Sequence, residues 1–95
     1  MEMQNPYFLE LLRREFNERK ARDPQYSIRR FARALRIDAT MLSRILRGSE
    51  ILTMRTSRNI LLAVSLKEEE RERFIGSVLE AQRQKWLTNL TPTQH

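Results

Sequence analysis

The middle of the chain contains two short runs of apolar residues at helical spacing, with a tight turn between them. In the first run, the apolar positions are Ile28, Phe31, Ala32 and Leu35. They fall at i, i+3, i+4 and i+7, which places them on one face of a helix. In the second run, the apolar positions are Leu42, Ile45 and Leu46. The pattern predicts two helices of about two turns each, which bury an apolar face only if the flanking chain covers it.

Capping residues mark the ends of these two helices. Ser27 is expected to cap the first and Asp38 the second, because their side-chain oxygens can accept free backbone N–H groups of the first turn. Gly48 is expected to end the second helix in the left-handed conformation that glycine adopts without strain. The two helices are therefore predicted at about residues 28–35 and 38–47, in a helix-turn-helix arrangement.

Three further helices are predicted around this pair. The first starts at Pro6, with Asn5 as its cap, and runs to about residue 21. Another follows a Thr53 cap and covers about residues 54–64. The last opens on glutamates 68–70, where the helix dipole favours acidic side chains, and runs to about Trp86. Gly76 within it is expected to mark a close helix contact. The residues expected to be buried in these helices are Phe8, Leu9, Leu12, Phe16, Ile60, Leu61, Val64, Phe74, Ile75, Val78 and Leu79, with Tyr7 and Leu11 at the edge.

The expected fold is all-α: a compact five-helix bundle, with one domain at residues 1–87 and a flexible tail or linker at residues 88–95. Ninety-five residues are enough for one domain with a modest core. Cysteine is absent, which excludes disulfides and thiolate metal sites. The longest apolar run, residues 60–64, is far short of the roughly 20 residues that span a bilayer. No secretory signal is visible, so a cytoplasmic location without membrane association is expected.

The net charge of +6 is concentrated in one segment of the chain. Residues 27–58 carry eight arginines against only Asp38 and Glu50, whereas basic and acidic residues cancel on either side. Arginine is abundant throughout, 15 against three lysines, but this abundance does not explain why acids are missing from this segment alone. A basic stripe confined to one element is typical of a polyanion-binding site.

The segment resembles the helix-turn-helix of the lambda-repressor-like, or Xre-type, DNA-binding domains. The residues that match the family pattern are Ala32 where the helices cross, Ile37 after the turn, Leu42-Ser43 and Ile45 on the next helix, and the closing Gly48. The resemblance covers roughly residues 6 to 80, and the family fold is a bundle of about five helices. The chain is also similar to the N-terminal part of a set of larger, poorly characterised bacterial proteins.

Two positions depart from the family pattern. Arg36 occupies a turn position where the family often has glycine, and a left-handed conformation costs arginine roughly 1 kcal/mol. Ile28 replaces a frequent glutamine that clamps a phosphate. Ser27, Arg29 or the N–H groups of the helix itself would have to take over this contact.

The resemblance implies that the helix at about 38–47 reads base edges in the major groove. The candidate base contacts are Ala39, Thr40, Ser43 and Arg44, and Arg44 suits a bidentate contact with guanine. The candidate phosphate contacts are Ser27, Arg29, Arg33, Arg36, Arg47, Ser49, Thr53 and Arg55. Arg30 points away from the side that Arg29, Arg33 and Arg36 share.

Three other functional classes are alternatives to a DNA-binding regulator. An enzyme is not expected, and neither a cofactor nor a metal is implied: the only histidine is His95, and no Gly-rich phosphate loop is present. A second alternative is a protein-interaction module of adaptor or antitoxin-like type. Such a module would not need eight arginines around one pair of helices. RNA binding lacks an aromatic placed for base stacking on the basic face. The expected partners are double-stranded DNA and a second copy of the chain, through Trp86, Leu87 and Leu90.

Overall fold

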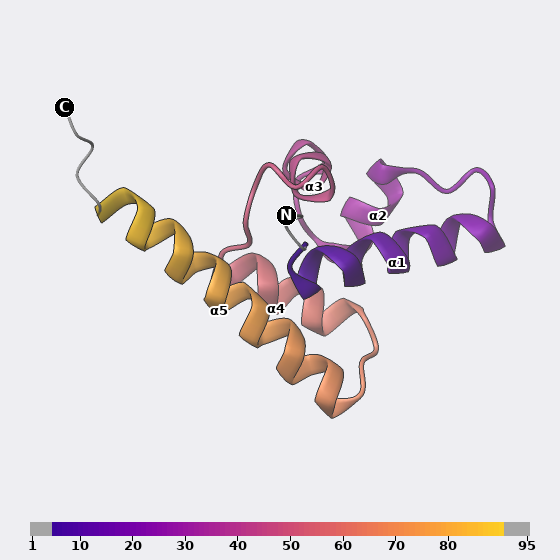
Figure 1. Ribbon diagram of the computed structural model, residues 1–95. Helices are drawn as coiled ribbons and strands as arrows, with labels where there is room; N and C mark the ends of the chain where they lie inside the picture. The colour runs from indigo at the N-terminus through magenta and orange to yellow at the C-terminus, as the bar shows by residue number, and fades with distance from the viewer. Residues whose placement is uncertain (1–4, 91–95) are drawn as a thin grey trace.

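Within the residues that the structure describes, the protein is an all-helical bundle of five helices, as predicted (Figure 1). The computed structural model describes residues 5–90. The helices are α1 (Tyr7–Arg22), α2 (Ile28–Leu35), α3 (Ala39–Leu46), α4 (Met54–Ala63) and α5 (Glu68–Leu90). α1 packs against α5 and α3, α2 packs against α3 and α4, and α4 also contacts α5. None of these helices is long and apolar enough to cross a membrane.

Every helix contributes to one hydrophobic core, in which the flanking helices cover the apolar faces of α2 and α3. The buried apolar side chains are Phe8, Leu9, Leu11, Leu12, Phe31, Ala32, Leu35, Leu42, Ile45, Leu52, Ile60, Val64, Phe74 and Val78. An aromatic cluster closes one end of the core, where Phe16 lies 5.6 Å from Phe31 and 6.1 Å from Tyr26 between ring centroids. Burial of this apolar surface is the main driving force that holds the two short helices in place.

The predicted burial in α1, α4 and α5 is correct at most positions and differs at five. Leu11, predicted at the edge, is fully buried, whereas Phe16, Leu61 and Ile75 are only half-buried. Leu79, predicted in the core, has 48% of its surface exposed. Gly76 does not mark a helix contact, because a Cβ built there would meet no atom within 4 Å.

Three of the four predicted caps are confirmed. Ser27, Asp38 and Thr53 each accept the N–H of the residue three positions later, at 3.1 to 3.2 Å. Asn5 is not a cap: Pro6 takes the cap position and makes no side-chain hydrogen bond. At this end of α1, the Phe8 N–H donates instead to Ser77 Oγ of α5, at 3.0 Å.

α5 is longer than predicted. It continues past Trp86 to Leu90, so the predicted domain boundary between residues 87 and 88 lies within this helix. The remainder of the predicted tail, residues 91–95, lies outside the described residues. In Figure 1 the C-terminal part of α5 projects beyond the other four helices.

Candidate nucleic-acid interface

The turn between α2 and α3 is built on a left-handed arginine. Arg36 has φ 61° and ψ 43°, and it is the only residue other than glycine with positive φ in the described part of the chain. The Arg36 N–H donates to the Arg33 carbonyl at 3.2 Å, and the Ile37 N–H donates to the Ala32 carbonyl at 3.0 Å. These two bonds form a Schellman motif, the usual hydrogen-bonding pattern for a left-handed helix end. The turn thus keeps the geometry that glycine favours.

A side chain of α4 supports the same turn. Asn59 Nδ2 donates to the Arg36 carbonyl oxygen at 3.1 Å, across 23 residues of sequence. This bond satisfies a carbonyl at the end of α2 that has no partner within the helix. It therefore ties the strained residue to the body of the bundle.

The C-terminal end of α3 is closed by a second Schellman motif. The Gly48 N–H donates to the Ile45 carbonyl at 2.9 Å, and the Ser49 N–H donates to the Arg44 carbonyl at 3.0 Å. Gly48 has φ 82°, which confirms the left-handed conformation predicted for it. With Asp38 at its start, α3 is a helix of eight residues that has both ends capped.

An arginine of α1 holds this end of α3 from outside. The Arg13 guanidinium donates two hydrogen bonds to the Leu46 carbonyl oxygen, from Nε at 2.9 Å and from Nη2 at 2.7 Å. A cation at a helix C-terminus is also favoured by the helix dipole. Arg13 therefore fixes α3 relative to α1, a role that no local sequence signal indicates.

A hollow of about 470 Å³ lies between α2 and α3. Its lining consists of Ser27, Ile28, Arg29, Ala39, Thr40, Ser43 and Arg47. All of these except Ile28 are candidate DNA contacts predicted from the sequence. The Arg47 Nη1 group donates to Ser43 Oγ at 3.3 Å, which links two of them across one turn of helix. The hollow thus brings together three candidate base contacts and three candidate phosphate contacts.

The other candidates lie on neighbouring surfaces. Arg33 lines a separate hollow with Arg19, Tyr26 and Arg30, and Arg36 lines another with Arg58 and Asn59. Arg55 lies on α4, where its stem borders a groove facing α5. The remaining candidates, all exposed, are Arg44, Ser49 and Thr53. The hydroxyls of Ser49 and Thr53 already make hydrogen bonds within the chain.

The arginines of residues 27–58 differ in whether they form an ion pair. Arg30 Nη1 lies 2.8 Å from Asp23 Oδ2, and its guanidinium stacks on the Tyr26 ring at 5.0 Å. The hydrogen bond from Arg30, with a further one from the Gln25 N–H, holds the pKa of Asp23 below its ordinary value. The other seven arginines of the segment form no ion pair with any described acidic residue: Arg29, Arg33, Arg36, Arg44, Arg47, Arg55 and Arg58.

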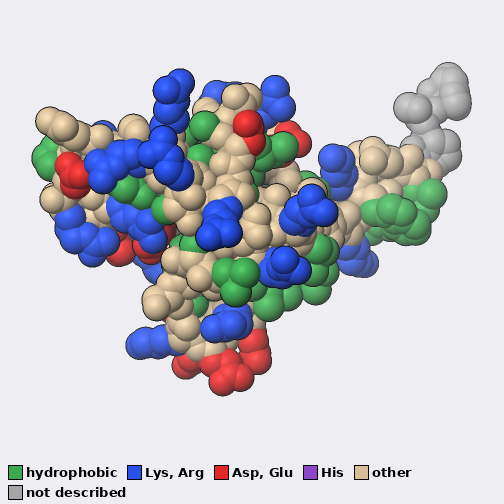
Figure 2. Space-filling model, turned by 180° about the vertical axis from the view of Figure 1, so that it is seen from behind, with side chains coloured by type: hydrophobic (Ala, Val, Ile, Leu, Met, Phe, Trp, Pro, Cys, Tyr) green, Lys and Arg blue, Asp and Glu red, His purple; other side chains and the backbone are tan. Residues whose placement is uncertain are grey.

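This uncompensated charge lies at the surface, where a polyanion can reach it. All seven arginines are exposed. Seen from the side opposite to Figure 1, Lys and Arg side chains are spread over the surface of the protein, and a group of acidic side chains lies at its lower end (Figure 2). Within the described residues, no three His, Cys, Asp or Glu side chains are grouped to hold a metal ion. The chemistry that this face offers is therefore binding of anions by hydrogen bonds and charge.

Comparison with known proteins finds no family model, no curated protein and no solved structure that matches this chain. The functional argument consequently depends on the residues and on the geometry of α2, α3 and their neighbours.

Proposed function

We propose that this protein is a DNA-binding transcriptional regulator that reads the major groove with α3. The observation that carries the proposal is the α2–α3 hollow, where hydroxyl, methyl and guanidinium groups gather on one exposed surface. The major groove of B-DNA admits a single helix, and the outward face of such a helix meets the base edges. Two capped ends and the Arg13 contact make α3 rigid enough to present its side chains in one geometry.

In this proposal the first turns of α3 read the bases. Thr40 and Ala39 meet a thymine methyl group, and Arg44 makes a bidentate contact with guanine O6 and N7. Ser43 lies at the margin of this set, where its Oγ accepts a hydrogen bond from Arg47. Ser27 and Arg29 hold a phosphate at the other wall of the hollow, in place of the clamp that Ile28 cannot provide.

The unpaired arginines supply the contacts to the backbone of the duplex. Arg29 and Arg47 border the hollow itself. Arg33, Arg36 and Arg55 extend the basic surface along α2 and α4. With about four phosphates neutralised per copy, the logarithm of the binding constant is expected to fall with the logarithm of salt concentration at a slope near −4.

The first test is fluorescence anisotropy of the protein with a labelled random-sequence duplex at about 50 and 200 mM salt. A steep loss of affinity with salt is expected, because counterions are released from the phosphates. Arg29→Ala should reduce the slope by about 1. Arg30→Ala is the matched control, and it should leave the slope unchanged because Asp23 already neutralises this arginine. Absence of binding at about 50 mM salt would overturn the proposal for this chain.

The second test assigns the base contacts. After selection of a preferred site from random duplexes, Arg44→Ala is expected to lower the affinity for that site by about 1–3 kcal/mol and to change the affinity for random duplex little. An equal loss on both duplexes would make Arg44 a phosphate contact. The contacts with the bases would then have to come from other residues of α3.

A protein-interaction module is the second candidate function. The observation that favours it is an apolar groove between α4 and α5, on a surface separate from the α2–α3 hollow. The two functions are compatible, because a regulator that binds a two-fold related site presents one α3 helix from each of two copies. If the protein binds DNA in the first test, the groove belongs to a regulator. If it does not, the groove belongs to an adaptor.

A further inference from the structure

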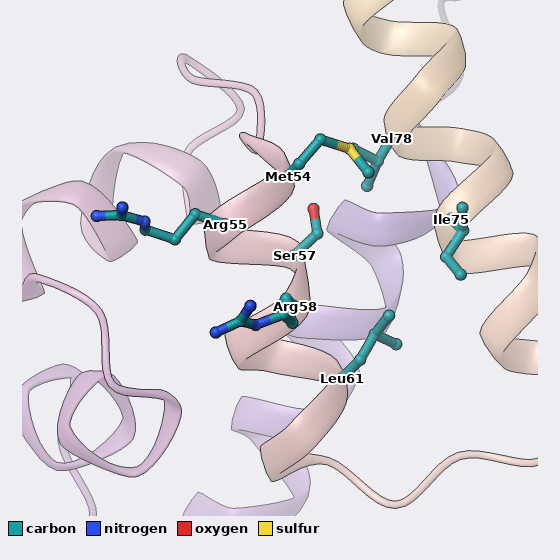
Figure 3. A pocket seen from close by; sticks show the side chains of 7 residues that line it. All are labelled: Met54, Arg55, Ser57, Arg58, Leu61, Ile75 and Val78. Atoms are coloured by element: carbon teal, nitrogen blue, oxygen red, sulfur yellow. The ribbon is translucent and has the colours of Figure 1, made fainter.

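A groove of about 410 Å³ lies between α4 and α5 (Figure 3). Among its lining residues, Val78 and Ser57 are buried, and Leu61 and Ile75 are half-buried. The Ser57 hydroxyl donates to the Thr53 carbonyl oxygen at 2.8 Å, so its hydrogen is already used within α4. The interior of the groove is therefore apolar, and it suits apolar groups of a binding partner.

The length of the groove matches two turns of a helix. Its α4 side runs from Met54 to Leu61, which are seven residues or roughly 10 Å apart along the helix axis. Apolar residues at positions i, i+4 and i+7 of a second helix span the same distance. Met54 is 55% exposed and extends toward Val78 at one end of the groove (Figure 3). Methionine adapts its shape to a neighbouring surface, so this residue suits contact with an incoming side chain.

Hydrogen bonds beyond both ends of the groove hold its two helices in place. Gln82 Nε2 of α5 donates to the Leu52 carbonyl oxygen, just before α4, at 2.8 Å. At the other end, the connection from α4 to α5 is short, and the Lys67 N–H donates to Glu70 Oε1 of α5 at 3.0 Å. A groove that is already formed in the free protein requires less ordering when a partner binds.

Unpaired arginines border the groove on α4. Arg55 and Arg58 are exposed and form no ion pair with a described acidic residue. Their charged ends point away from α5, beyond the apolar interior (Figure 3). On α5, Arg71 precedes Ile75 by one helical turn, and it is likewise exposed without a described acidic partner. The α4 edge of the groove is therefore basic.

The outer edge of the groove on α5 has a different chemistry. Leu79 is 48% exposed and follows the groove residue Ile75 by one turn. Arg83, one turn further, pairs with Glu80 at 3.6 Å. Glu72 precedes Leu79 by seven residues, which places it on the same side of α5. This edge therefore presents an apolar side chain and no excess of positive charge.

We propose that the groove between α4 and α5 binds an acidic amphipathic helix of a partner protein. Apolar residues of the partner fill the groove and contact Leu79, and Asp or Glu residues on the flank that covers α4 face Arg55 and Arg58. Binding of an amphipathic helix in a hydrophobic groove is a recurring mode of peptide recognition. The different chemistry of the two edges determines which flank of the partner helix is acidic.

The direction of the arginines favours a helix over a small molecule. A small ligand inside the groove lies away from the charged ends of Arg55 and Arg58, which point outward (Figure 3). A helix is about 10 Å across with its side chains, so it covers the groove and reaches beyond the α4 edge. The inference deepens the second candidate function by naming the partner. It does not depend on DNA binding, because the groove and the α2–α3 hollow have no lining residue in common.

The first part of the test is a selection from a display library of helical peptides of about 16 residues, with the full chain as the target. Every peptide has leucine at positions i, i+4 and i+7, and both flanks of this stripe are randomised among glutamate, glutamine and lysine. Enrichment of glutamate on one flank only is expected, because only the α4 edge carries unpaired arginines. Enrichment of lysine, or no enrichment over the starting library, would overturn the proposal.

Fluorescence anisotropy with the selected peptide then assigns the binding site. Met54→Glu places a carboxylate in the groove, at a position in the first turn of α4 that the helix dipole favours, and it should raise the dissociation constant about tenfold or more. Arg58→Gln should raise it about two- to fivefold, as expected for loss of an exposed ion pair. Circular dichroism checks that each variant is folded.

Each of these variants has a matched control. Leu62→Glu adds the same charge to α4, but Leu62 is 78% exposed and lines a different hollow. Arg22→Gln removes an exposed arginine from the end of α1. Both controls should leave the dissociation constant of the peptide unchanged.

Two further results would overturn the proposal. Equal affinity of the peptide for the parent protein and for Met54→Glu would mean that the peptide binds elsewhere, for example on the arginines of α2 and α3. Self-association of the parent protein below about 500 μM that Met54→Glu abolishes, measured by sedimentation equilibrium, would make a second copy the occupant of the groove. These measurements contain no DNA, so failure of this proposal is distinct from failure of the proposed DNA binding.

Discussion

Among the described residues other than glycine, Arg36 is the one with a left-handed backbone. Its left-handed conformation brings Cβ close to the carbonyl oxygen, and glycine avoids this penalty. The surrounding hydrogen bonds, from Ile37 to Ala32 and from Asn59 to Arg36, hold the turn in place regardless of the side chain. The turn therefore does not depend on an arginine side chain at this position, and phosphate binding is the role that we propose for it.

Arg36→Gly is accordingly expected to stabilise the fold while weakening DNA binding. Relief of the left-handed strain should raise the free energy of unfolding by about 1 kcal/mol, or the melting temperature by about 4–8 °C. Thermal unfolding followed by circular dichroism measures this change. Arg33→Gly is the control, because it removes an arginine from inside α2 and should cost about 1 kcal/mol. Destabilisation by both changes would mean that the arginine side chain itself supports the turn.

Residue-scale predictions from the sequence are correct where the signal is local. Ser27, Asp38, Thr53 and Gly48 act at helix ends within three residues of themselves, so the chain around them is enough to identify their roles. Asn5 is the counterexample. The free N–H at the start of α1 is satisfied by Ser77 Oγ, 69 residues away, which no local pattern can indicate.

At the scale of the element, α3 is positioned by contacts that the sequence does not reveal. Its amphipathic spacing predicts that it exists and which face is buried. Its orientation depends on Arg13 bonding to Leu46 across 33 residues, and on Asn59 bonding to the turn before it. The candidate contacts could therefore be named from the sequence. Which of them line the α2–α3 hollow, and which line the adjacent hollows, is seen only in the structure.

Arg13→Ala is expected to be one of the most destabilising single changes outside the core. It removes two charge-assisted hydrogen bonds and leaves the Leu46 carbonyl without them, which should cost about 1.5–3 kcal/mol in urea unfolding. Arg14→Ala is the control on the same helix. Arg14 is half-exposed and pairs with Glu70 at 3.5 Å, so its loss should cost less than about 1 kcal/mol. Equal costs for the two variants would contradict the role assigned to Arg13.

α5 shows why helical periodicity alone does not fix what is buried. Phe74, Ile75, Val78 and Leu79 form one broad apolar face in the sequence. The bundle buries the side that carries Phe74 and Val78 and half-buries Ile75, whereas 48% of the Leu79 surface stays exposed.

Across the whole molecule, the net charge of +6 is held at the surface by arginines that lack acidic partners. Seven of these charges lie on α2, α3, α4 and the residues that end α2 and α3, and repulsion among like charges opposes the compact state. The all-α fold class follows from composition and periodicity. The concentration of charge along the chain also follows from the sequence, because the arginines lie within 32 consecutive residues.

Salt is therefore expected to stabilise the fold of the free protein while it weakens DNA binding. Raising sodium chloride from about 10 to 500 mM shortens the screening length from roughly 30 Å to a few ångströms and relieves the repulsion. We expect the melting temperature to rise by a few degrees, since about 1 kcal/mol corresponds to 4–8 °C in a domain of this size. The double variant Arg33→Gln, Arg58→Gln should show a smaller rise. A melting temperature that falls with salt would indicate that the ion pairs of the surface outweigh the repulsion.

The bond between Arg13 and Leu46 has a practical consequence for protein engineering. α2, α3 and their caps form a continuous segment of about 20 residues that looks suitable for grafting onto another scaffold. Such a graft would carry its arginines and its Schellman motifs but would leave behind the guanidinium that anchors its far end. The smallest portable unit therefore extends back to α1, or the recipient scaffold has to offer a donor at the same place.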